Sequence, residues 1–462
     1  MKELLGQFSR RIQEPTDVAS VVFFRFCFGM LMFWEITRYF YFGWVEDLFV
    51  RPQFHFQYEL FMWVVPLPGN GMYVLFGVLG ILALMISFGL FYRLAAILFF
   101  LGYGYIFLID KATYNNHFYL ICLLSFVLIL APLNKSWSLD VLRGTEKHID
   151  KLPVFWLWLF RFHMGIVYFY GGIAKFDSDW LNGLATRELL VAANRGTIFQ
   201  SLMEIEWVPY FYAWSGLLFD LLIPFLLLRK SIRKWALIAA IFFHTNNYFI
   251  FQIGIFPILS IALTIMYFDA EFPRKIVPAR IKNWFSTKYR KRVLSLQRVS
   301  FGTSSRVSNQ QINRTVQLFF VFYVLIQLVL PFRHLQYPGR TIWHEEGHYF
   351  AWRMMLRQKI TRLQFNVTHP HTGEQRYADP RDYLNSSQFK VFAGNPGMIL
   401  QFAHHLDSLV QNNAGFDPKI TAKIEVSLNG REFRELVDPD LDLSKIPLYE
   451  PSNNWIKPFM EL

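Results

Sequence analysis

Charged residues are scarce in this sequence, at 17% of 462 residues against about 25% in soluble domains, whereas hydrophobic residues make up 53%. This imbalance excludes a disordered, collagenous or low-complexity chain and predicts a membrane protein. Cysteine is almost absent, and Cys27 and Cys122 both lie in long apolar runs. A disulfide framework is therefore not expected, although two thiols leave a single bridge open.

The N-terminus lacks the pattern of a signal peptide. The segment MKELLGQFSRRIQEPTD is polar throughout, so the order of basic, apolar and small residues that precedes a cleavage site is missing. We expect the first membrane helix to direct insertion. An internal repeat is also missing, which argues against an inverted-repeat transporter.

Apolar runs long enough to cross a bilayer, about 17 to 25 residues, recur through most of the chain. The clearest begin at Val18, Met72, Leu94, His117, Val154, Val208, Trp235 and Val316. The run from Trp235 to Phe268 is too long for one crossing and is interrupted at Gln252 and Gly254, so it predicts two helices. We therefore expect nine membrane helices, with eight as the alternative.

The distribution of Lys and Arg predicts the orientation. With a cytoplasmic N-terminus and nine spans, the inner segments hold 23 Lys and Arg residues and the outer loops before the last helix hold 6. This excess follows the positive-inside rule. The basic segment 269–314 is interpreted as a cytoplasmic loop near anionic lipid and not as a nucleic-acid patch. The predicted domains are a cytoplasmic N-terminus (1–17), a transmembrane domain (18–332) and an extracytoplasmic β-rich domain (333–462).

The C-terminal region has strand and turn signals. The runs ITRLQFNVT and KITAKIEVSL predict strands, and Asn429-Gly430 between alternating runs is a strong hairpin signal. Between the two runs, NPGMILQFAHHLDSLVQ has apolar residues at helical spacing. The expected fold is a polytopic α-helical membrane bundle of about nine helices, followed by an outer, mostly β domain with one or two helices.

Ionisable side chains inside a membrane span are costly and by default mark a functional site. In the fifth span, Arg161, Tyr168, Gly172 and Lys175 lie on one stripe of the helix because of their spacing. Lys175 has two interpretations. It either extends to the lipid headgroups at the outer end of the helix, or it is partly buried, where an uncharged amine can act as a base.

Other spans also carry polar groups. Asn116 and His117 follow the third span, and His244 lies in the outer half of the seventh. These residues suit hydrogen bonding to a polar head whose tail lies in lipid, while a turn, a helix cap and a core histidine are the structural alternatives. Three further residues are expected to form ion pairs or hydrogen bonds between helices: Arg25, Glu35 and Asp220.

The pentapeptide HEEGH, from His344 to His348, matches the HExxH pattern of zinc proteases, where two histidines one helical turn apart hold the metal. Its surroundings, WHEEGHYFAWRMML, alternate like a strand, which would place the two histidines one strand register apart. We therefore expect no metal site here.

Several segments together resemble the vitamin K-dependent gamma-glutamyl carboxylase family. They are FLIDKATYNNHFYL, VYFYGGIAKFDSDWLNG, FHTNNYFIFQIGIF, FAWRMML and EVSLNGREFRELVDPDLDL. The resemblance runs from about Asp17 to Leu462. The short chain and the missing C-terminal extensions are similar to a bacterial member with the horizontally transferred transmembrane domain, located in the inner or plasma membrane.

The resemblance implies an activity and site residues. The family oxidises a reduced naphthoquinone with O2 to its epoxide and uses the strong base formed on the way to add CO2 to glutamate. The initiating lysine of the motif GGIAKFDSDW corresponds to Lys175. From the resemblance and the helix stripe together, the expected quinol-binding residues are Asn116, His117, His244, Tyr168, Arg161, Trp352, Met354 and Met355.

The leading hypothesis is a gamma-carboxylase-like integral membrane enzyme. Its expected cofactor is reduced vitamin K or a menaquinol-like naphthoquinone, with O2 and CO2 as co-substrates and no metal. Its expected partners are membrane lipid, lipophilic quinol and a glutamate-containing protein or peptide, with no nucleic acid. The alternatives are a quinol epoxidase that does not carboxylate glutamate, and a non-enzymatic transporter or receptor.

Overall fold

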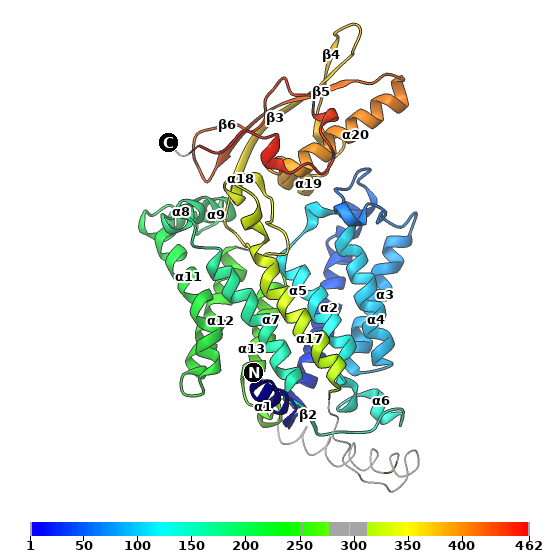
Figure 1. Cartoon of the computed structure of the whole chain (residues 1–462), viewed down its shortest axis with the longest axis vertical. Helices are drawn as coiled ribbons and strands as arrows, with labels where there is room; N and C mark the ends of the chain where they lie inside the picture. The colour runs from blue at the N-terminus through cyan, green and yellow to red at the C-terminus, as the bar shows by residue number, and fades with distance from the viewer. Residues whose placement is uncertain (1, 252, 277–294, 296–311, 461–462) are drawn as a thin grey trace.

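The computed structural model describes residues 2–251, 253–276, 295 and 312–460. A bundle of long helices forms the body of the molecule, and a C-terminal domain built on a sheet covers one end of the bundle (Figure 1). The N-terminal helix α1 (Lys2–Ile12) and strands β1 (Pro15–Asp17) and β2 (Lys151–Pro153) lie at the opposite end. The N-terminal segment and the C-terminal domain therefore lie at opposite ends of the bundle.

A helix lies at each position where the hydropathy pattern predicts a span. These helices are α2 (Ala19–Tyr41), α3 (Gly71–Phe88), α4 (Tyr92–Ile109), α5 (Asn116–Leu130), α7 (Val154–Ile173), α11 (Trp207–Leu228), α12 (Arg233–Ile250), α13 (Phe256–Thr264) and α17 (Arg314–Val329). Within the described residues, five helices are long and apolar enough to cross a membrane: α2, α3, α4, α11 and the stretch Arg314–Gln336. The chain is thus a membrane protein, and crossing by all nine helices stays a prediction.

The break predicted at Gln252 and Gly254 is present, and Gln252 itself lies outside the described residues. Helix α12 ends at Ile250, and α13 begins at Phe256 with Pro257 in its first turn. Gly254 has a φ of +54°, in the left-handed region that glycine enters without a steric penalty. Proline at the start of a helix gives up only an N–H that would have no partner there. The long apolar run therefore forms two helices.

Two predicted interhelical partners behave differently. Arg25 on α2 is buried and donates to the carbonyl oxygens of Leu133 at 2.8 Å and Trp137 at 2.7 Å, so it connects α2 to the chain after α5. The prediction for Glu35 was wrong in its partner: Glu35 pairs with Arg38 on the same helix, at 2.7 Å. Side chains three residues apart lie on one face of a helix, so the pair forms locally.

The C-terminal domain contains an antiparallel sheet with strand order β4-β3-β5-β6. The strands are β3 (Lys359–Thr368), β4 (Gln375–Ala378), β5 (Lys419–Leu428) and β6 (Arg434–Glu435). Asn429 and Gly430 have φ values of +51° and +76°, as a two-residue hairpin turn requires, which confirms the hairpin after β5. The helices that accompany the sheet are α19 (Ser386–Phe392) and α20 (Pro396–Ala414).

Helix α20 forms where the apolar spacing predicts it. Its first turn is capped by Asn395, whose side-chain oxygen accepts a hydrogen bond from the Met398 N–H at 3.1 Å, and it ends at Gly415 in the left-handed conformation. Phe402 on α20 packs with Phe365 of β3 and Phe392 of α19 in the core of the domain. The sheet and the two helices therefore share one hydrophobic core.

Buried polar contacts join the two domains. Asp179, in the short helix α8 (Ser178–Leu181), is fully buried and accepts hydrogen bonds from Asn429 at 2.8 Å, Arg340 at 2.9 Å and Arg431 at 2.7 Å. Burial alone would raise the pKa of Asp179, but these hydrogen bonds outweigh it and hold the pKa below its ordinary value. The carboxylate is thus ionised and fixes the C-terminal domain on the bundle.

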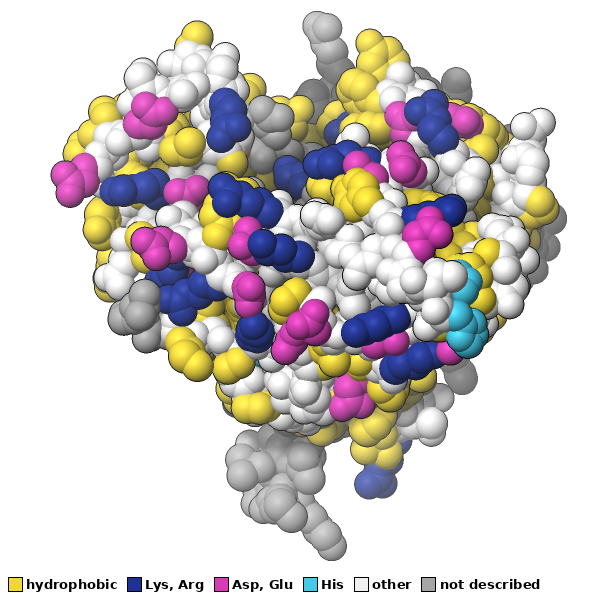
Figure 2. Space-filling view, turned by 90° about the horizontal axis from the view of Figure 1, so that it is seen from above, with side chains coloured by type: hydrophobic (Ala, Val, Ile, Leu, Met, Phe, Trp, Pro, Cys, Tyr) yellow, Lys and Arg dark blue, Asp and Glu magenta, His cyan; other side chains and the backbone are white. Residues whose placement is uncertain are grey.

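The surface of the C-terminal domain differs from the flanks of the bundle. Figure 2 shows Lys and Arg interspersed with Asp and Glu over the face seen from above. Exposed apolar side chains such as Val74, Ile81 and Phe242 are instead on the bundle helices. This division is typical of a protein whose helices face lipid and whose C-terminal domain faces water. Most of the basic segment 269–314 lies outside the described residues.

Candidate functional site

Lys175 lies in the interior, just beyond the end of α7. Its residue is 6% exposed, and its Nζ donates to the carbonyl oxygen of Gly171 at 3.0 Å and to Oδ2 of Asp220 at 2.6 Å. The ring of Trp180 lies 5.1 Å from the same Nζ. The side chain therefore turns into the protein and does not extend to the headgroups.

Asp220 comes from the middle of α11, and small residues allow its helix to approach α7. A Cβ added at Gly172 would lie 2.7 Å from Cδ2 and 3.0 Å from the backbone nitrogen of Leu221. A Cβ at Gly216 would lie 3.9 Å from Cε of Lys175. Close helix approach through glycine is the usual packing device inside membranes. The expected interhelical role of Asp220 is confirmed, and its partner is Lys175.

The loop after Lys175 does not neutralise it. Asp177 and Asp179, the acidic residues nearest in sequence, both pair with Arg340, at 3.0 and 2.9 Å. Only Asp220 forms a salt bridge with Lys175 within the described chain. The site therefore holds one buried lysine side chain and one buried aspartate side chain, each about nine-tenths covered.

Met354 reaches this pair from the C-terminal domain. A Cβ at Gly171 would lie 3.1 Å from Cε of Met354 and 3.4 Å from Oδ2 of Asp220. The Met354 methyl group and the Asp220 carboxyl group therefore both border the space that a side chain at position 171 would occupy. Tyr168, Gly171 and Lys175 are spaced by three and four residues, so they share one face of α7. Met354 therefore lies beside the face of α7 that leads to Lys175, and its expected contact with the quinol stays a prediction.

The segment 350–355 is held by the start of α5. The Tyr114 hydroxyl accepts from the Phe350 N–H at 2.6 Å and donates to Oδ1 of Asn116 at 3.0 Å. Nδ2 of Asn116 donates to the Arg353 carbonyl oxygen at 3.3 Å. Within the described residues, this is the one hydrogen bond that Nδ2 donates, so its second hydrogen has no acceptor there. Asn116 therefore positions the segment, and its expected contact with the quinol stays a prediction.

The same segment has an unusual backbone. Phe350, Trp352 and Met355 have φ values of +61°, +56° and +55°, and Glu345 nearby has +65°. Such values cost a bulky residue of order 1 to 3 kcal/mol and persist only where surrounding contacts impose them. Backbone strain of this kind clusters at ligand sites. The segment next to Lys175 is thus stabilised by the rest of the fold, not by its own preferences.

Two histidines flank one aromatic ring. The rings of His117 and His244 each lie 6.0 Å from the ring of Phe256, at the start of α13. Tyr168 and His244 share a hydrogen bond of 2.6 Å through Nε2, while the buried Nδ1 of His244 has no partner within the described residues. The structure thus brings Tyr168, His117 and His244 into one aromatic cluster.

Other predicted residues lie elsewhere. Arg161 donates to the carbonyl oxygens of Met266 at 2.7 Å and Phe268 at 3.2 Å, so it caps the chain after α13 and is not part of this cluster. At about 1.5 Å per residue, it lies about 20 Å along α7 from Lys175. Trp352 is fully buried against Tyr119, with ring centroids 5.0 Å apart. Met355 is half-buried in the strained segment.

The HEEGH residues do not form a strand. Residues Thr341–His344 form the short helix α18, and turns follow, because Glu345 has a left-handed backbone. Glu345 is buried and pairs with Arg357 and, at 2.7 Å, with Lys359, while Nε2 of His348 lies 3.3 Å from Arg357. Within the described residues, no three His, Cys, Asp or Glu side chains are grouped as metal ligands.

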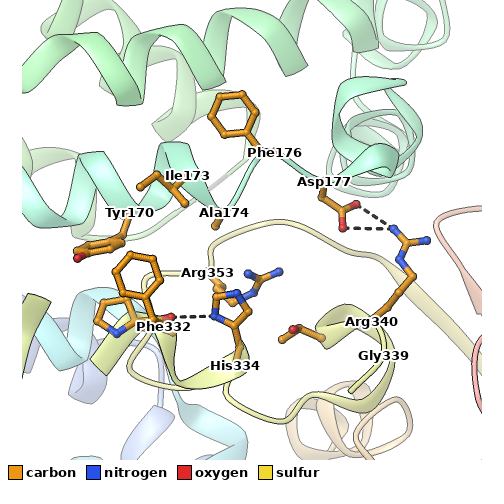
Figure 3. Close-up of a pocket in the computed structure, with 13 residues that line it drawn as sticks. Tyr170, Ile173, Ala174, Phe176, Asp177, Phe332, His334, Gly339, Arg340 and Arg353 are labelled. Carbon is orange, nitrogen blue, oxygen red and sulfur yellow. Dashed lines mark hydrogen bonds and ion pairs between the residues drawn. The ribbon is translucent and has the colours of Figure 1, made fainter. Parts of the chain in front are cut away.

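A cavity of about 300 Å³ lies beside the end of α7 (Figure 3). Tyr170 and Phe332 form its apolar side, and Arg340 and Arg353 come from the C-terminal domain. Ala174, which directly precedes Lys175, lines it too. This cavity could not be predicted from the sequence, because its lining residues come from segments far apart in the chain.

Two protein-family models match this chain. The family model for the HTTM domain matches residues 13–272, more than half of the chain, and the model for the vitamin K-dependent gamma-carboxylase lumenal domain matches residues 312–461. The chain belongs to the vitamin K-dependent gamma-carboxylase family. No solved structure matches it.

The resemblance seen in the sequence is thus confirmed. The gamma-carboxylase family uses vitamin K hydroquinone, O2 and CO2 and acts on glutamate-containing substrates. The two family matches meet at the site, since α7 and α11 lie in the first and Met354 in the second. The chain is a carboxylase-like membrane protein of this family, with a C-terminal domain of the lumenal kind.

Sequence reasoning overlooked two features of the site. It did not pair Asp220 with Lys175, although a lone acidic residue in the apolar run LLFDLLIPF is a signal for a buried partner. It also did not single out Arg353, which stands between Trp352 and Met354 in the segment quoted for the resemblance. A basic residue inside an apolar, aromatic segment is a comparable signal.

Proposed function

We propose that this protein is an integral membrane enzyme that oxidises a reduced naphthoquinone with O2 at a site around Lys175 and carboxylates glutamate. The observation that carries the proposal is the buried Lys175–Asp220 pair, 2.6 Å apart, beside the apolar Met354. We further propose that the N-terminus is cytoplasmic and the C-terminal domain extracytoplasmic, so that the site opens on the outer side.

The pair supports a proton-accepting role for Lys175. A Lys175 amine that has lost its proton would leave the Asp220 carboxylate buried without a counter-charge, which is unfavourable, so the amine is driven to take up a proton again. In the neutral form, the amine has a lone pair that can take a proton from a quinol hydroxyl. Asp220 then stabilises the ammonium that forms. Lys175 is thus proposed as the catalytic base and Asp220 as the residue that positions it and holds its charge.

The surrounding residues fit a reduced naphthoquinone. Nδ1 of His244 is a buried polar atom without a partner in the described chain, and the ring of His117 makes no hydrogen bond there. Phe256, between the two histidines, offers a flat apolar face for a bicyclic ring. We propose that His117, His244 and the free Nδ2 hydrogen of Asn116 bind the ring oxygens, and that Met354 covers the ring.

A glutamate γ-proton is too weakly acidic for an amine to remove it, and oxidation of the bound quinol would supply the missing driving force. The protein itself therefore needs only to bind, orient and deprotonate the quinol, and to keep water from the reacting atoms. Burial of Lys175, Asp220 and Trp352 supports such exclusion of water. CO2 is then added to the carbon that lost its proton.

The test is formation of the epoxide by purified protein in nanodiscs supplied with reduced vitamin K and O2. Lys175→Ala is expected to abolish the product, whereas Lys423→Ala, at an exposed position on β5, is expected to retain it. Labelled CO2 and a glutamyl peptide in the same assay separate a carboxylase from an epoxidase. No epoxide from well-folded wild type would refute the proposal.

A further inference from the structure

The cavity beside the end of α7 has one apolar side and one cationic side. Tyr170, Ile173 and Phe332 line it from the bundle, and Arg340 and Arg353 line it from the C-terminal domain (Figure 3). The cavity volume of about 300 Å³ is large enough for a side chain and its adjoining backbone. An occupant would therefore meet positive charge at one end and hydrocarbon at the other.

The two guanidinium groups are not equivalent. Arg340 is held by Asp177 and Asp179, at 3.0 and 2.9 Å, and the dashed lines in Figure 3 mark its contact with Asp177. Arg353 is 9% exposed, and within the described residues its side chain has no ion pair or hydrogen bond; its buried Nε is left without a partner. Arg353 thus contributes one uncompensated positive charge to the cavity.

An unpaired buried guanidinium is unfavourable. Desolvation costs several kcal/mol for an ion in a protein interior unless an opposite charge compensates it. Burial accordingly lowers the pKa of Arg353, with Asp177 opposing the shift from a distance. A fold retains an unpaired buried arginine where a ligand supplies the opposite charge. The planar guanidinium group of arginine matches the two oxygens of a carboxylate.

The cavity and the proposed base share a wall. Ala174 lines the cavity and directly precedes Lys175, while Met354 directly follows Arg353 and lies against Gly171 beside the Lys175–Asp220 pair. Asn116 fixes the backbone at Arg353 through the 3.3 Å bond to its carbonyl oxygen. The cation is therefore positioned by the same residues that build the site around Lys175.

We propose that this cavity binds the side-chain carboxylate of an acidic peptide, with Arg353 as the cation that neutralises it. The proposal rests on the proposed function, for which it supplies the site of the second substrate. A single carboxylate matches the single uncompensated charge, because Asp177 already balances Arg340. A cation at the carboxylate also stabilises negative charge that develops on the neighbouring carbon when its proton is removed.

The test measures binding to the full-length protein in phosphatidylcholine nanodiscs by calorimetry. A blocked glutamyl peptide is expected to bind at least tenfold more tightly than its glutaminyl twin. Arg353→Gln should remove that difference, and Arg353→Lys should retain part of it. Arg376→Gln, at an exposed arginine on β4, should behave like wild type.

Stability provides a second readout. Because the Arg353 side chain has no partner in the described chain, Arg353→Gln is expected to unfold at the same temperature as wild type or higher. If Arg353→Gln loses the preference for the glutamyl peptide and is as stable as wild type, the result supports binding of the peptide carboxylate in the cavity. A clear fall in unfolding temperature means that Arg353 supports the fold, and this overturns the proposal.

Two further results would also overturn it. One is a glutamyl preference that survives in Arg353→Gln. The other is loss of peptide binding in phosphatidylglycerol nanodiscs, because an anionic lipid headgroup would then be the occupant. Epoxide formation by wild type, measured without peptide, separates the two proposals: its absence refutes the proposed function, whereas epoxide formation with Arg353-independent binding refutes the carboxylate site alone.

Discussion

Lys175 and Asp220 are 45 residues apart in sequence and belong to different helices, yet Nζ of one lies 2.6 Å from Oδ2 of the other. Their contact depends on how closely α7 and α11 pack, and Gly172 permits that approach because it has no side chain to meet Leu221. The position of the partner of the proposed base thus depends on a helix interface. Variants of the pair and of the interface should therefore have distinct effects.

Asp220→Asn removes the carboxylate and keeps the shape of the side chain. It leaves Lys175 buried without its partner, which is expected to cost about 3 to 5 kcal/mol of stability and to reduce epoxide formation at least tenfold. The double variant Lys175→Met with Asp220→Leu should recover most of the stability but no activity. Thermal unfolding in nanodiscs and the epoxide assay measure both quantities. An Asp220→Asn protein as stable and active as wild type would contradict the proposed role of the pair.

Gly172→Ala tests the interface between the helices. The added Cβ would lie 2.7 Å from Leu221 Cδ2 and 3.0 Å from its backbone nitrogen, so α7 and α11 must separate, at a cost of about 1 to 3 kcal/mol. Gly165→Ala on the same helix is the matched control, since its Cβ would meet only the Tyr267 hydroxyl at 3.5 Å. The first variant should lose stability and epoxide formation, and the second should retain both. Equal behaviour of the two variants would exclude close packing as the reason for Gly172.

Glu345 predicts how the C-terminal domain responds to acid. Burial would raise its pKa, but Arg357 and Lys359 outweigh burial and lower the pKa from 4.5 to about 2. A depressed carboxyl pKa stabilises the fold above pH 4.5, and this stability is lost as the pH falls toward 2. Unfolding curves should therefore show that wild type loses stability as the pH falls from 4.5 to about 2. In Glu345→Gln, the part of this loss that comes from Glu345 should be absent.

At neutral pH, Glu345→Gln should also lower stability by about 3 to 5 kcal/mol, because Arg357 and Lys359 lose a buried partner. Glu374→Gln is the control, since Glu374 pairs with Arg376 at an exposed position, where an ion pair contributes about 0 to 1 kcal/mol. Equal loss in the two variants would show that burial of Glu345 has no energetic effect.

The orientation can be measured with single cysteines. Thr372 lies in the exposed turn between β3 and β4, and Gln7 is exposed on α1 at the opposite end of the molecule (Figure 1). In a background without Cys27 and Cys122, Thr372→Cys should react with an impermeant maleimide on intact cells. Gln7→Cys should react only after permeabilisation. The reverse pattern would place the C-terminal domain in the cytoplasm.

Much of the fold followed from local sequence. The positions of the bundle helices were predicted from apolar length, the division near Gly254 from an interruption, and the hairpin at Asn429-Gly430 from turn chemistry. These features depend on neighbours a few residues away, whose spacing is visible in a sequence. The strand predicted around HEEGH was wrong because contacts from Arg357 and Lys359 hold Glu345 in a turn.

The sequence by itself determined that the chain enters a membrane and that Lys175 ends a span, since hydropathy and charge are properties of single segments. Only the tertiary structure decided that Asp220 is its partner and that Arg353 faces a cavity without a counter-charge. It also separated Arg161 from Lys175, which the helical stripe had grouped together. Electrostatic neighbours depend on the packing of distant helices, and spacing along one segment does not reveal that packing.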